Sequence, residues 1–523
     1  MSTVTLQNLT FHHSDPYVNV FTDISLHIDT GWRTALIGRN GRGKTTLLNL
    51  LRGLLEPTHG YLELPLPTAS FPCQPSDPLS AAFTVIKESI APFQKWELQM
   101  QALLEKPDQE NLTLYAAIAE KHELNRGYEI DGLIHKEVAA IGLAEELLKH
   151  PFSILSGGEQ TRALIAALFL QEGRFLLLDE PTDHLDMWGR ERLGEYLAAK
   201  TGFILASHDR QLLNRCTDHV LAINMSNLEL IQGNYATWKL EAERRLATEQ
   251  QRDEKLKREI SKLKIAAGKR RVWSGKKEKE KIGADDKGFV GHRAAKVMKR
   301  ALAIERRIDD NIVEKETLLQ NREKKRDLKF ISTGRSPELL LTVDHLQVSF
   351  DDRAVISDFS MTINRGERIA LLGCNGSGKT TLLNAISGDI VPDTGRVLFP
   401  AYLELLRAFQ QPLWQHGELR QHLKDAALDE TRFRQILAVL GAEGTICDRP
   451  LETFSQGELK KVDICRSFMS PVHLLLWDEP LNYIDVMSRE QIEEVVLEFE
   501  PTLLFVEHDR QFVERIATRV VEM

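Results

Sequence analysis

Two glycine-rich segments of the chain carry the residue types that bind phosphate groups. Residues 38–45 (GRNGRGKT) and 373–380 (GCNGSGKT) each end in a lysine and a threonine. Glycines let backbone N–H groups curve around a phosphate, and a helix that begins at the loop adds its positive end. We therefore expect Lys44 and Lys379 to contact the β- and γ-phosphates of a nucleotide. The hydroxyl of the threonine that follows each lysine is expected to hold Mg²⁺.

Paired carboxylates follow short apolar segments in both halves of the chain. Asp179 and Glu180 come after FLLL, and Asp478 and Glu479 come after LLLW. A short apolar run is typical of a buried parallel strand, and open α/β sheets bind ligands at the C-terminal ends of such strands. We expect the aspartates on the Mg²⁺ side, and the glutamates to act as general bases or to polarise the attacking water. A solvated turn is the competing interpretation of each pair.

Two histidines occupy equivalent places farther along. His208 and His508 each follow an apolar segment, at residues 203–206 and 503–506. A single histidine of this kind is more often structural. Because the pattern occurs twice at the same interval, we interpret both histidines as sensors of the γ-phosphate.

The chain therefore contains one module written twice. The glycine-rich loop returns after 335 residues, and the carboxylate segment returns after 299. In each copy an apolar segment, at residues 34–37 and 369–372, precedes the loop and a leucine-rich segment follows it. This order predicts a strand, a phosphate loop and a helix in succession. Two homologous units are expected at about 1–232 and 337–523.

A change of offset locates an insertion in the first copy. Gln74-Pro75 and Gln411-Pro412 differ by 337 positions, so the 38 extra residues lie between Gln74 and Ser156. Residues 112–128 carry apolar side chains at three- and four-residue spacing, which predicts a helix. We expect a helical arm within about 80–150. A plain surface insertion is an equal alternative, since surface loops tolerate extra length.

The segment between the modules, residues 233–336, is strongly basic. Residues 239–330 hold 29 Lys and Arg against 17 Asp and Glu, although the whole chain has a formal net charge of −9. The local field decides whether a surface attracts phosphate. Residues 235–265 and 292–326 have the composition of exposed helices, and glycines interrupt the stretch between them. We expect an antiparallel helical hairpin with a tip at about 266–291.

Basic residues surround an aromatic residue in this tip. They are Lys269, Arg270, Arg271, Trp273, Lys276, Lys277, Lys279 and Lys281. This mixture suits structured RNA, because phosphates take the charge and an exposed base can stack on the ring. The alternative is that Trp273 packs against the helices of its own hairpin.

Composition limits the remaining classes. With 42% hydrophobic and 27% charged residues, the chain is not disordered over most of its length. No stretch approaches the ~18 consecutive apolar residues of a membrane-spanning helix. The first residues lack the pattern of a signal peptide, and the five cysteines lack metal-ligand spacing. We expect a cytoplasmic protein.

The complete motif set resembles the ATP-binding-cassette (ABC) superfamily. Its signature appears as LSGGEQ at 155–160 and FSQGELK at 454–460. The other matching residues are Gln74 and Gln411 (Q-loops) and Asp186 and Asp485 (D-loops). The resemblance implies an α/β protein with two tandem P-loop ATP-binding-cassette domains joined by an antiparallel α-helical hairpin linker.

The resemblance also implies how the sites are assembled. Two cassettes of one monomer would pack head to tail, which pairs Lys44 with Ser455 and Lys379 with Ser156. Gln456 stands where a glycine is usual, so the first site is expected to differ chemically from the second. The implied ATP-binding residues are Gly38, Asn40, Gly41, Gly43, Lys44, Thr45, Thr46, Gln74, Ser156, Gly157, Gly158, Glu159, Gly373, Asn375, Gly376, Gly378, Lys379, Thr380, Thr381, Gln411, Ser455, Gln456, Gly457 and Glu458. The implied Mg²⁺ ligands are Thr45, Gln74, Asp179, Thr380, Gln411 and Asp478. Phe11 or Tyr17 in the first copy, and Phe350 in the second, are candidates to stack on adenine, although Phe11 and Phe350 could equally be core residues.

Two cassettes joined by a charged hairpin look like the ABC-F proteins, which act on the ribosome. Within that family, residues 31–33 (GWR), 455–458 (SQGE) and 480–485 (PLNYID) are similar to the ribosomal protection proteins that confer antibiotic resistance. The implied partner is the 70S ribosome. The ATP-closed protein would occupy the E site, and its tip would reach 23S rRNA near the peptidyl-transferase centre and the P-site tRNA, displacing drug and tRNA before hydrolysis releases it.

Three alternatives remain at this point. The first is a housekeeping ABC-F translation factor for stalled or idle ribosomes, which shares most of these motifs. The second is the ATPase subunit of an ABC exporter, which does not explain the basic linker. The third is a DNA-maintenance ATPase, whose coiled coil would lie inside a cassette.

Overall fold

The computed structural model describes residues 2–14, 17–75, 77–105, 108–224, 228–245, 338–350, 353–442 and 444–523, with positions 247, 248, 251 and 258. Both modules belong to one compact unit, Met1–Ala236 with Arg326–Met523, and Thr237–Lys325 form a second. Residues 235–245, at the start of the predicted hairpin, are helical. Apart from positions 247, 248, 251 and 258, the rest of that hairpin and its basic tip lie outside the described residues, so the hairpin and its tip remain predictions.

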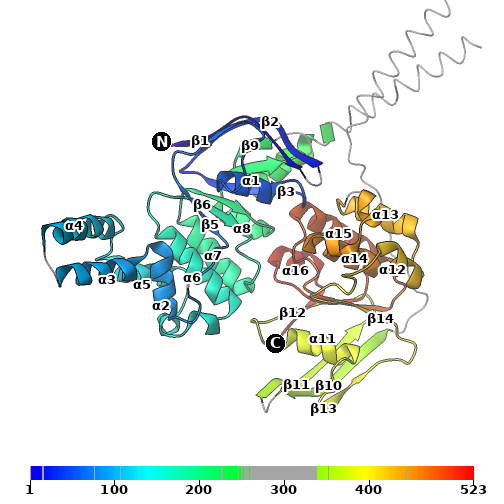
Figure 1. Cartoon of the computed structure of the whole chain (residues 1–523). Helices are drawn as coiled ribbons and strands as arrows, with labels where there is room; N and C mark the ends of the chain where they lie inside the picture. Colours follow the sequence, from blue (N-terminus) through cyan, green and yellow to red (C-terminus); the bar gives the residue numbers. More distant parts are fainter. Residues whose placement is uncertain are drawn as a thin grey trace, which may run out of the picture. The chain divides into compact units, whose positions relative to one another are not determined.

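The first module combines a small antiparallel sheet with a larger, mostly parallel one (Figure 1). Its strands are β1 (Thr3–Ser14), β2 (Tyr17–Asp29), β3 (Arg33–Gly38), β4 (His59–Glu63), β5 (Thr68–Phe71), β6 (Phe175–Asp179), β7 (Phe203–Ala206), β8 (His219–Ile223) and β9 (Leu228–Gln232). Its helices are α1 (Lys44–Leu51), α2 (Ala82–Ile90), α3 (Phe93–Leu104), α4 (Gln109–Leu124), α5 (Ile130–Ala140), α6 (Gly157–Phe169), α7 (Met187–Ala198) and α8 (Arg210–Cys216), with short 3-10 helices at Glu145–Lys149 and Phe152–Ile154. The sheet orders are β2-β1-β4 and β5-β6-β7-β3-β8-β9, with β9 antiparallel to β8.

The second module repeats this plan. Its strands are β10 (Leu339–Phe350), β11 (Arg353–Asn364), β12 (Arg368–Leu372), β13 (Thr394–Leu398), β14 (Leu405–Ala408), β15 (Leu474–Asp478), β16 (Leu503–Val506) and β17 (Arg519–Glu522). Its helices are α11 (Lys379–Ser387), α12 (Leu419–Asp425), α13 (Glu430–Val439), α14 (Gln456–Met469), α15 (Val486–Phe499) and α16 (Arg510–Ile516), with 3-10 helices at Gly444–Asp448 and Leu451–Thr453. The sheet orders are β11-β10-β13 and β14-β15-β16-β12-β17. The predicted α/β fold with two tandem cassettes is confirmed.

The short apolar segments suit strands that are covered on both faces of a sheet, because every residue of such a strand is buried. All five residues of β15 and all four of β7 and β16 are buried. In the first module β3 lies between β7 and β8 in parallel register, and in the second β12 lies between β16 and β17. The glycine-rich loops and the two histidines therefore leave the same C-terminal edge of each sheet.

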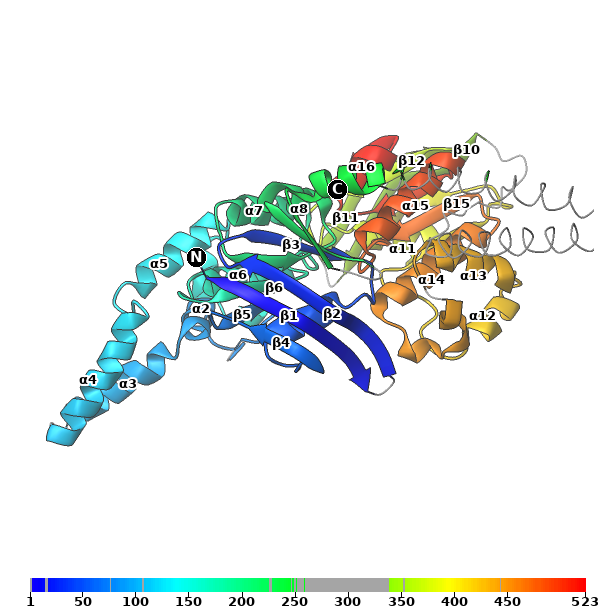
Figure 2. The same ribbon diagram turned by 90° about the horizontal axis from the view of Figure 1, so that it is seen from above.

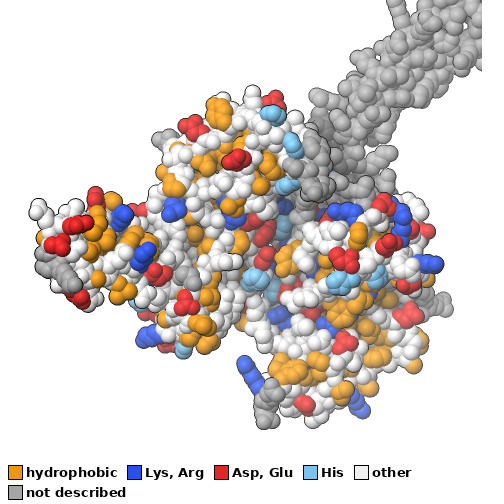
Figure 3. All heavy atoms as spheres, in the orientation of Figure 1, with side chains coloured by type: hydrophobic (Ala, Val, Ile, Leu, Met, Phe, Trp, Pro, Cys, Tyr) orange, Lys and Arg blue, Asp and Glu red, His pale blue; other side chains and the backbone are white. Residues whose placement is uncertain are grey.

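The insertion of the first module forms the helices α3 and α4. Equivalent bridges, Ala81 with Pro151 and Glu418 with Pro450, align α2 with α12, and α5 then corresponds to α13. Helices α3 and α4 lie side by side and extend from the rest of the first module (Figure 2). Helix α4 ends at Leu124, before the end of the predicted 112–128 segment, because Arg126 adopts a left-handed φ of 57°. Hydrophobic side chains, orange in Figure 3, are exposed on this helix pair.

Candidate functional site

Each glycine-rich loop runs from a central strand into a helix, from β3 to α1 and from β12 to α11. Gly43 and Gly378 are the residues that precede these helices, and both have φ = 96°. That backbone region is strained for any residue with a Cβ. A Cβ on Gly43 would also lie 2.5 Å from Val20 Cγ1. The backbone therefore favours glycine at both positions, and at Gly43 the lack of space excludes a Cβ as well.

The two loop lysines lie over their own loops. Lys44 Nζ donates to the carbonyl of Gly38 at 2.7 Å, and Lys379 Nζ donates to the carbonyl of Gly373 at 2.9 Å. Burial lowers the pKa of both lysines, and the carboxylates Glu180 and Glu479 are the first of the groups that oppose this shift. A cation held against backbone carbonyls in a buried loop suits a polyphosphate ligand, whose oxygens would satisfy it better.

The threonines of the loops are close to the strand-end aspartates. Thr380 Oγ1 donates to Asp478 Oδ1 at 3.3 Å, and the hydroxyl of Thr45 is near enough to Asp179 to lower the pKa of that carboxyl. Burial raises the pKa of both aspartates; Lys44 opposes this at Asp179, and Arg407 opposes it at Asp478. Hydroxyl and carboxylate oxygens are ligands that Mg²⁺ accepts, together with water and phosphate oxygens. Among the described residues there is no cluster of three or more His, Cys, Asp or Glu that could form a metal cage. The hydroxyl and carboxylate oxygens of the threonine–aspartate pairs thus fit Mg²⁺.

The second module surrounds Glu479 with hydrogen-bond donors. Gln410 Nε2 and Asn482 Nδ2 donate to its Oε2 at 3.1 Å and 2.6 Å, and His508 Nε2 lies 3.2 Å from its Oε1. Although burial opposes ionisation, the contacts with His508, Gln410 and Asn482 lower the pKa of Glu479 to about 2. This carboxylate is therefore ionised and fixed in place.

The first module gives Glu180 a different environment. Its Oε2 accepts from the backbone N–H of His208 at 3.1 Å, and its Oε1 lies 3.2 Å from His208 Nε2. Burial and the neighbouring carboxylate of Asp183 raise the pKa of Glu180 to about 8, against the effect of Lys44. The pKa of His208 is well below its ordinary value, because the ring is buried and Lys44 lies nearby. Glu180 and Glu479 share a left-handed backbone, with φ = 48° and 47°.

The signature serines cap helices. Ser156 is the N-cap residue of α6, and Ser455 is the N-cap residue of α14. The side chain of each serine accepts from the N–H of a glutamate three residues later, at 3.3 Å. Glu159 and Glu458 accept in return from the serine N–H at 2.8 Å. This reciprocal capping box explains the Ser-x-x-Glu spacing without any ligand. Gln456 is the first residue of α14 and does not prevent the box from forming.

Each loop asparagine contacts the opposite module. Asn40 Nδ2 donates to the carbonyl of Tyr483 at 2.6 Å, and Asn375 Nδ2 donates to the carbonyl of His184 at 3.4 Å. A Cβ on Gly457 would lie 2.5 Å from Asn40 Nδ2. The first phosphate loop therefore lies against the segment that follows the second signature serine. The pairing of Lys44 with Ser455 across this contact stays a prediction.

The D-loop aspartates differ between the modules. Asp485 is buried, accepts from Lys461 Nζ at 2.8 Å and lies 3.4 Å from the backbone nitrogen of Asn40. Its pKa is far below the ordinary value; burial opposes this shift, and Lys461 causes it. Asp186 caps α7 by accepting from Gly189 N at 2.8 Å.

Several predicted residues lie away from these contacts. Gln74 and Gln411 are exposed, and the hydrogen bond to Glu479 comes from Gln410, the residue before the predicted one. Phe11 is buried in the core of the first module, whereas the side chain of Phe350 is 48% exposed. Phe350 is therefore the better placed of these two for stacking on adenine, and the side chain of Tyr17 lies outside the described residues.

Both modules match one protein-family model. The ABC transporter model matches residues 21–183 in the first module and residues 356–482 in the second. The chain belongs to the ABC transporter family. It is an ABC-type ATPase with two ATP-binding cassettes and has the organisation of the ABC-F proteins.

Relatives within the family align with nearly the whole chain. The "Energy-dependent translational throttle protein EttA" of Haemophilus influenzae is 28% identical over 97% of this chain and 89% of its own length. "ABC transporter F family member 5" of Arabidopsis thaliana is 28% identical over 97% of this chain and 73% of its own length. The "ATP-binding protein Uup" of Escherichia coli is 26% identical over 99% and 80%. Among solved structures, an archaeal ribosome recycling factor, crystallised with a ribosomal stalk protein, has a TM-score of 0.55 at 19% identity and covers 98% of this chain and 87% of its own. That likeness establishes the shared fold.

Sequence reasoning missed three residues of this ABC ATPase that touch its strand-end carboxylates. Arg407 NH2 donates to Asp478 at 3.1 Å, and Gln410 and Asn482 contact Glu479. Asn482 could have been found, because its counterpart in the repeat, 299 residues earlier, is the acidic Asp183. No helix in the described part of the chain has the length and apolar character needed to cross a membrane.

Proposed function

We propose that this chain is an ABC-F ATPase that acts on the ribosome as a translation factor. The observation that carries the proposal is the alignment of 97% of the chain with a relative named as an energy-dependent translational throttle protein. The 29 Lys and Arg among residues 239–330 support it, because a basic segment between two cassettes suits a partner rich in phosphate. The domain limits 1–232, 233–336 and 337–523 are part of the proposal.

In this proposal each ATP lies between one phosphate loop and the opposite signature. Lys44 and Lys379 bind the phosphates, and the serines Ser156 and Ser455 complete the sites. The capping hydrogen bonds of these serines must then rearrange or be shared when ATP arrives. ATP binding closes the two cassettes, and hydrolysis separates them.

Mg²⁺ would be held at the threonine–aspartate pair of each site and would neutralise charge on the phosphates. Glu180 and Glu479 orient the attacking water, and His208 and His508 hold these carboxylates near the γ-phosphate. The two sites are unequal, because Glu479 has side-chain amide donors from Gln410 and Asn482, whereas Asp183 lies beside Glu180.

The test is co-sedimentation with 70S ribosomes. The double variant Glu180→Gln/Glu479→Gln keeps the shape of both sites and loses the carboxylates, so it should bind ATP and remain closed. We expect this variant to pellet with ribosomes when ATP is present and to remain in the supernatant without it. The matched control, Lys44→Ala/Lys379→Ala, should not pellet in either condition. If the double Glu variant binds ATP and still fails to pellet, the ribosomal proposal is wrong.

The resemblance of residues 31–33, 455–458 and 480–485 to the resistance proteins supports a second, narrower function. In that case the E-site-bound protein extends its basic tip toward 23S rRNA and the P-site tRNA and displaces a drug. Expression in a susceptible bacterium, followed by the inhibitory concentrations of lincosamide, streptogramin A and pleuromutilin drugs, separates the two functions. A protection factor raises these concentrations, and a general translation factor leaves them unchanged.

A further inference from the structure

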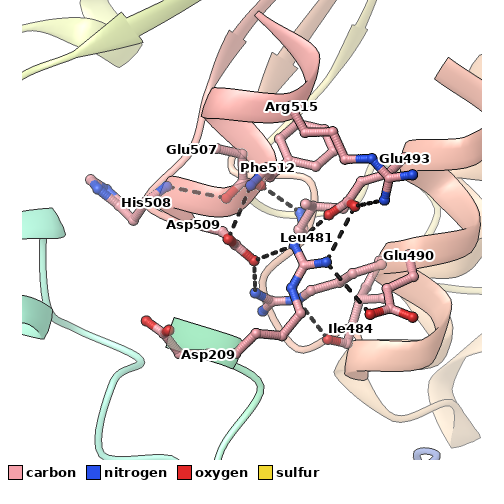
Figure 4. A network of polar contacts seen from close by, with 12 residues as sticks. Asp209, Leu481, Ile484, Glu490, Glu493, Glu507, His508, Asp509, Phe512 and Arg515 are labelled. Carbon is pink, nitrogen blue, oxygen red and sulfur yellow. Dashed lines mark hydrogen bonds and ion pairs between the residues drawn. The ribbon is translucent and has the colours of Figure 1, made fainter. Parts of the chain in front are cut away.

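A cluster of buried charges joins the two cassettes on one side. The side chain of Arg210, from α8 of the first cassette, is 4% exposed, and that of Glu493, from α15 of the second, is 0% exposed. Arg210 NH1 donates to Glu493 Oε2 at 3.2 Å, and its NH2 donates to Glu493 Oε1 and, at 3.3 Å, to Asp509 Oδ2. Figure 4 shows Glu490, Glu493 and Asp509 of the second cassette gathered near the segment that carries Asp209 of the first. The guanidinium is thus held by carboxylates from two elements of the other cassette.

Two further arginines bind the carboxylates of this cluster. Arg489 NH1 donates to Asp509 Oδ2 at 3.3 Å, and Arg515 NH1 donates to Glu493 Oε2 at 2.7 Å. Arg210 NH1 also lies 3.8 Å from Glu490 Oε1. Three arginines therefore face three carboxylates, and of these six residues only Arg210 comes from the first cassette. Buried charges persist in a protein only when they are paired in this way.

The duplicated sequence shows that this contact is one-sided. The counterpart of Glu493 in the first cassette is Gly194, which has no side chain to receive an arginine. The counterpart of Arg210 is Arg510, whose side chain is 47% exposed and donates through Nε to Glu514 of its own helix at 2.8 Å. The repeat therefore supplies a matched pair of arginines, one buried between cassettes and one on the surface.

Asp509 connects this cluster to the second ATP site. Asp509 follows His508, whose Nε2 lies 3.2 Å from Glu479 Oε1. Asp509 also caps α16 by accepting from Phe512 N at 3.1 Å. Arg210 and Arg489 both donate to Oδ2 of Asp509. Because Asp509 is the next residue after His508, these two contacts restrain the backbone that carries the His508 side chain.

We propose that Arg210 is a positioning residue through which the first cassette holds His508 and controls ATP hydrolysis at the site of Lys379. This inference rests on the proposed roles of His508 and Glu479. It assigns to the first cassette an arginine that holds the histidine turn of the second site, and the counterpart Arg510 of the second cassette makes no such contact with the described residues of the first. ATP hydrolysis at the second site would then depend on the contact of Arg210 with the second cassette, and hydrolysis at the first site would not. This difference is separate from any effect of Gln456.

The experiment measures each site separately in the full chain. The background Glu180→Gln leaves Glu479 as the active base, and the background Glu479→Gln leaves Glu180. In the first background we expect Arg210→Gln to lower kcat by about 10- to 100-fold with KM for ATP unchanged, since misplacing a catalytic group has this effect. In the second background it should change kcat by less than about twofold. Arg510→Gln should change kcat by less than about twofold in both, and Arg210→Lys should restore part of the loss.

Three results would overturn the proposal. Equal losses in both backgrounds would show a purely structural role for Arg210, and no loss in either would show that His508 does not depend on it. If Arg510→Gln has the same effect as Arg210→Gln, the one-sided contact is irrelevant. Should Arg210→Gln fold poorly because Glu493 keeps only Arg515 as an arginine partner, the double variant Arg210→Gln/Glu493→Gln removes both charges and gives the same comparison. Wild-type hydrolysis by Glu180→Gln/Glu479→Gln would instead refute the assignment of the bases, which is a separate failure.

Discussion

At the scale of single residues, the two ATP sites differ most where the repeat replaces an amide by an acid. Asn482 donates to Glu479 at 2.6 Å, whereas its counterpart Asp183 adds negative charge near Glu180. Gln410 adds a second donor in the second cassette, at a position where the first cassette has Cys73. The local chemistry therefore favours an ionised, fixed carboxylate in the second site.

We predict that Asn482→Asp slows hydrolysis at the second site. The change removes a hydrogen bond to Glu479 and places a like charge beside it, so kcat in the Glu180→Gln background should fall by about 10-fold or more. The same chemical change at Asn125, the exposed C-cap residue that follows α4, serves as the control and should leave kcat unchanged. An unchanged rate in Asn482→Asp would show that this hydrogen bond is not used during turnover.

At the scale of elements, the strands that depend on a local apolar pattern could be predicted from the sequence. The strands before each phosphate loop, at residues 34–37 and 369–372, lie within β3 and β12, and the histidine strands match β7 and β16. A strand that is buried on both faces consists of consecutive apolar residues, which can be recognised in the sequence. Because each motif occurs twice in the same order, the order of the elements could be predicted as well.

Contacts between distant elements could not be predicted in the same way. Arg210 and Glu493 are 283 positions apart, and neither has a motif that indicates a partner. Gln410 was missed because the repeat aligns Gln411 with Gln74, and only the geometry after β14 shows which glutamine contacts Glu479. Arg126 ended α4 early through its backbone conformation, which the apolar spacing does not encode.

The capping boxes allow a prediction that separates helix stability from ATP binding. Ser455→Ala removes the cap of α14 and should lower the free energy of unfolding by about 1 kcal/mol. If Ser455 also contacts ATP, its loss should weaken ATP binding as well. The control is Asp429→Ala, which removes the cap of α13, a hydrogen bond from Arg432 N at 2.6 Å, outside either site.

Thermal unfolding and titration with a fluorescent ATP analogue measure the two effects. Both variants should lose similar stability, and only Ser455→Ala should lose affinity. Equal affinity in the two variants would mean that the serine is a helix cap alone.

At the scale of the whole molecule, charge is distributed by segment. The chain has a formal net charge of −9, yet residues 239–330 carry 12 more basic than acidic residues. Since repulsion by an acidic surface weakens contact with RNA, a ribosome-binding function must depend on the basic segment. In the proposed function, the ATP sites and the RNA contact would then be located in different parts of the chain and could be altered independently.

Replacing Lys269, Arg270 and Arg271 by glutamine tests this separation. Each lost phosphate contact reduces the slope of log affinity against log salt concentration by about 0.7–0.9, so three should reduce it by about 2. Ribosome binding by the ATP-trapped Glu180→Gln/Glu479→Gln protein, measured between low and physiological salt, gives that slope. The control removes three exposed lysines of the cassettes, Lys136, Lys149 and Lys424, and should leave the slope unchanged. ATPase activity without ribosomes should be unaffected when the same three basic residues are replaced in the otherwise wild-type chain. The opposite result would be an unchanged salt slope for the variant at residues 269–271 and a reduced salt slope for the variant of the three cassette lysines. It would mean that the cassettes, and not the linker, make the RNA contact.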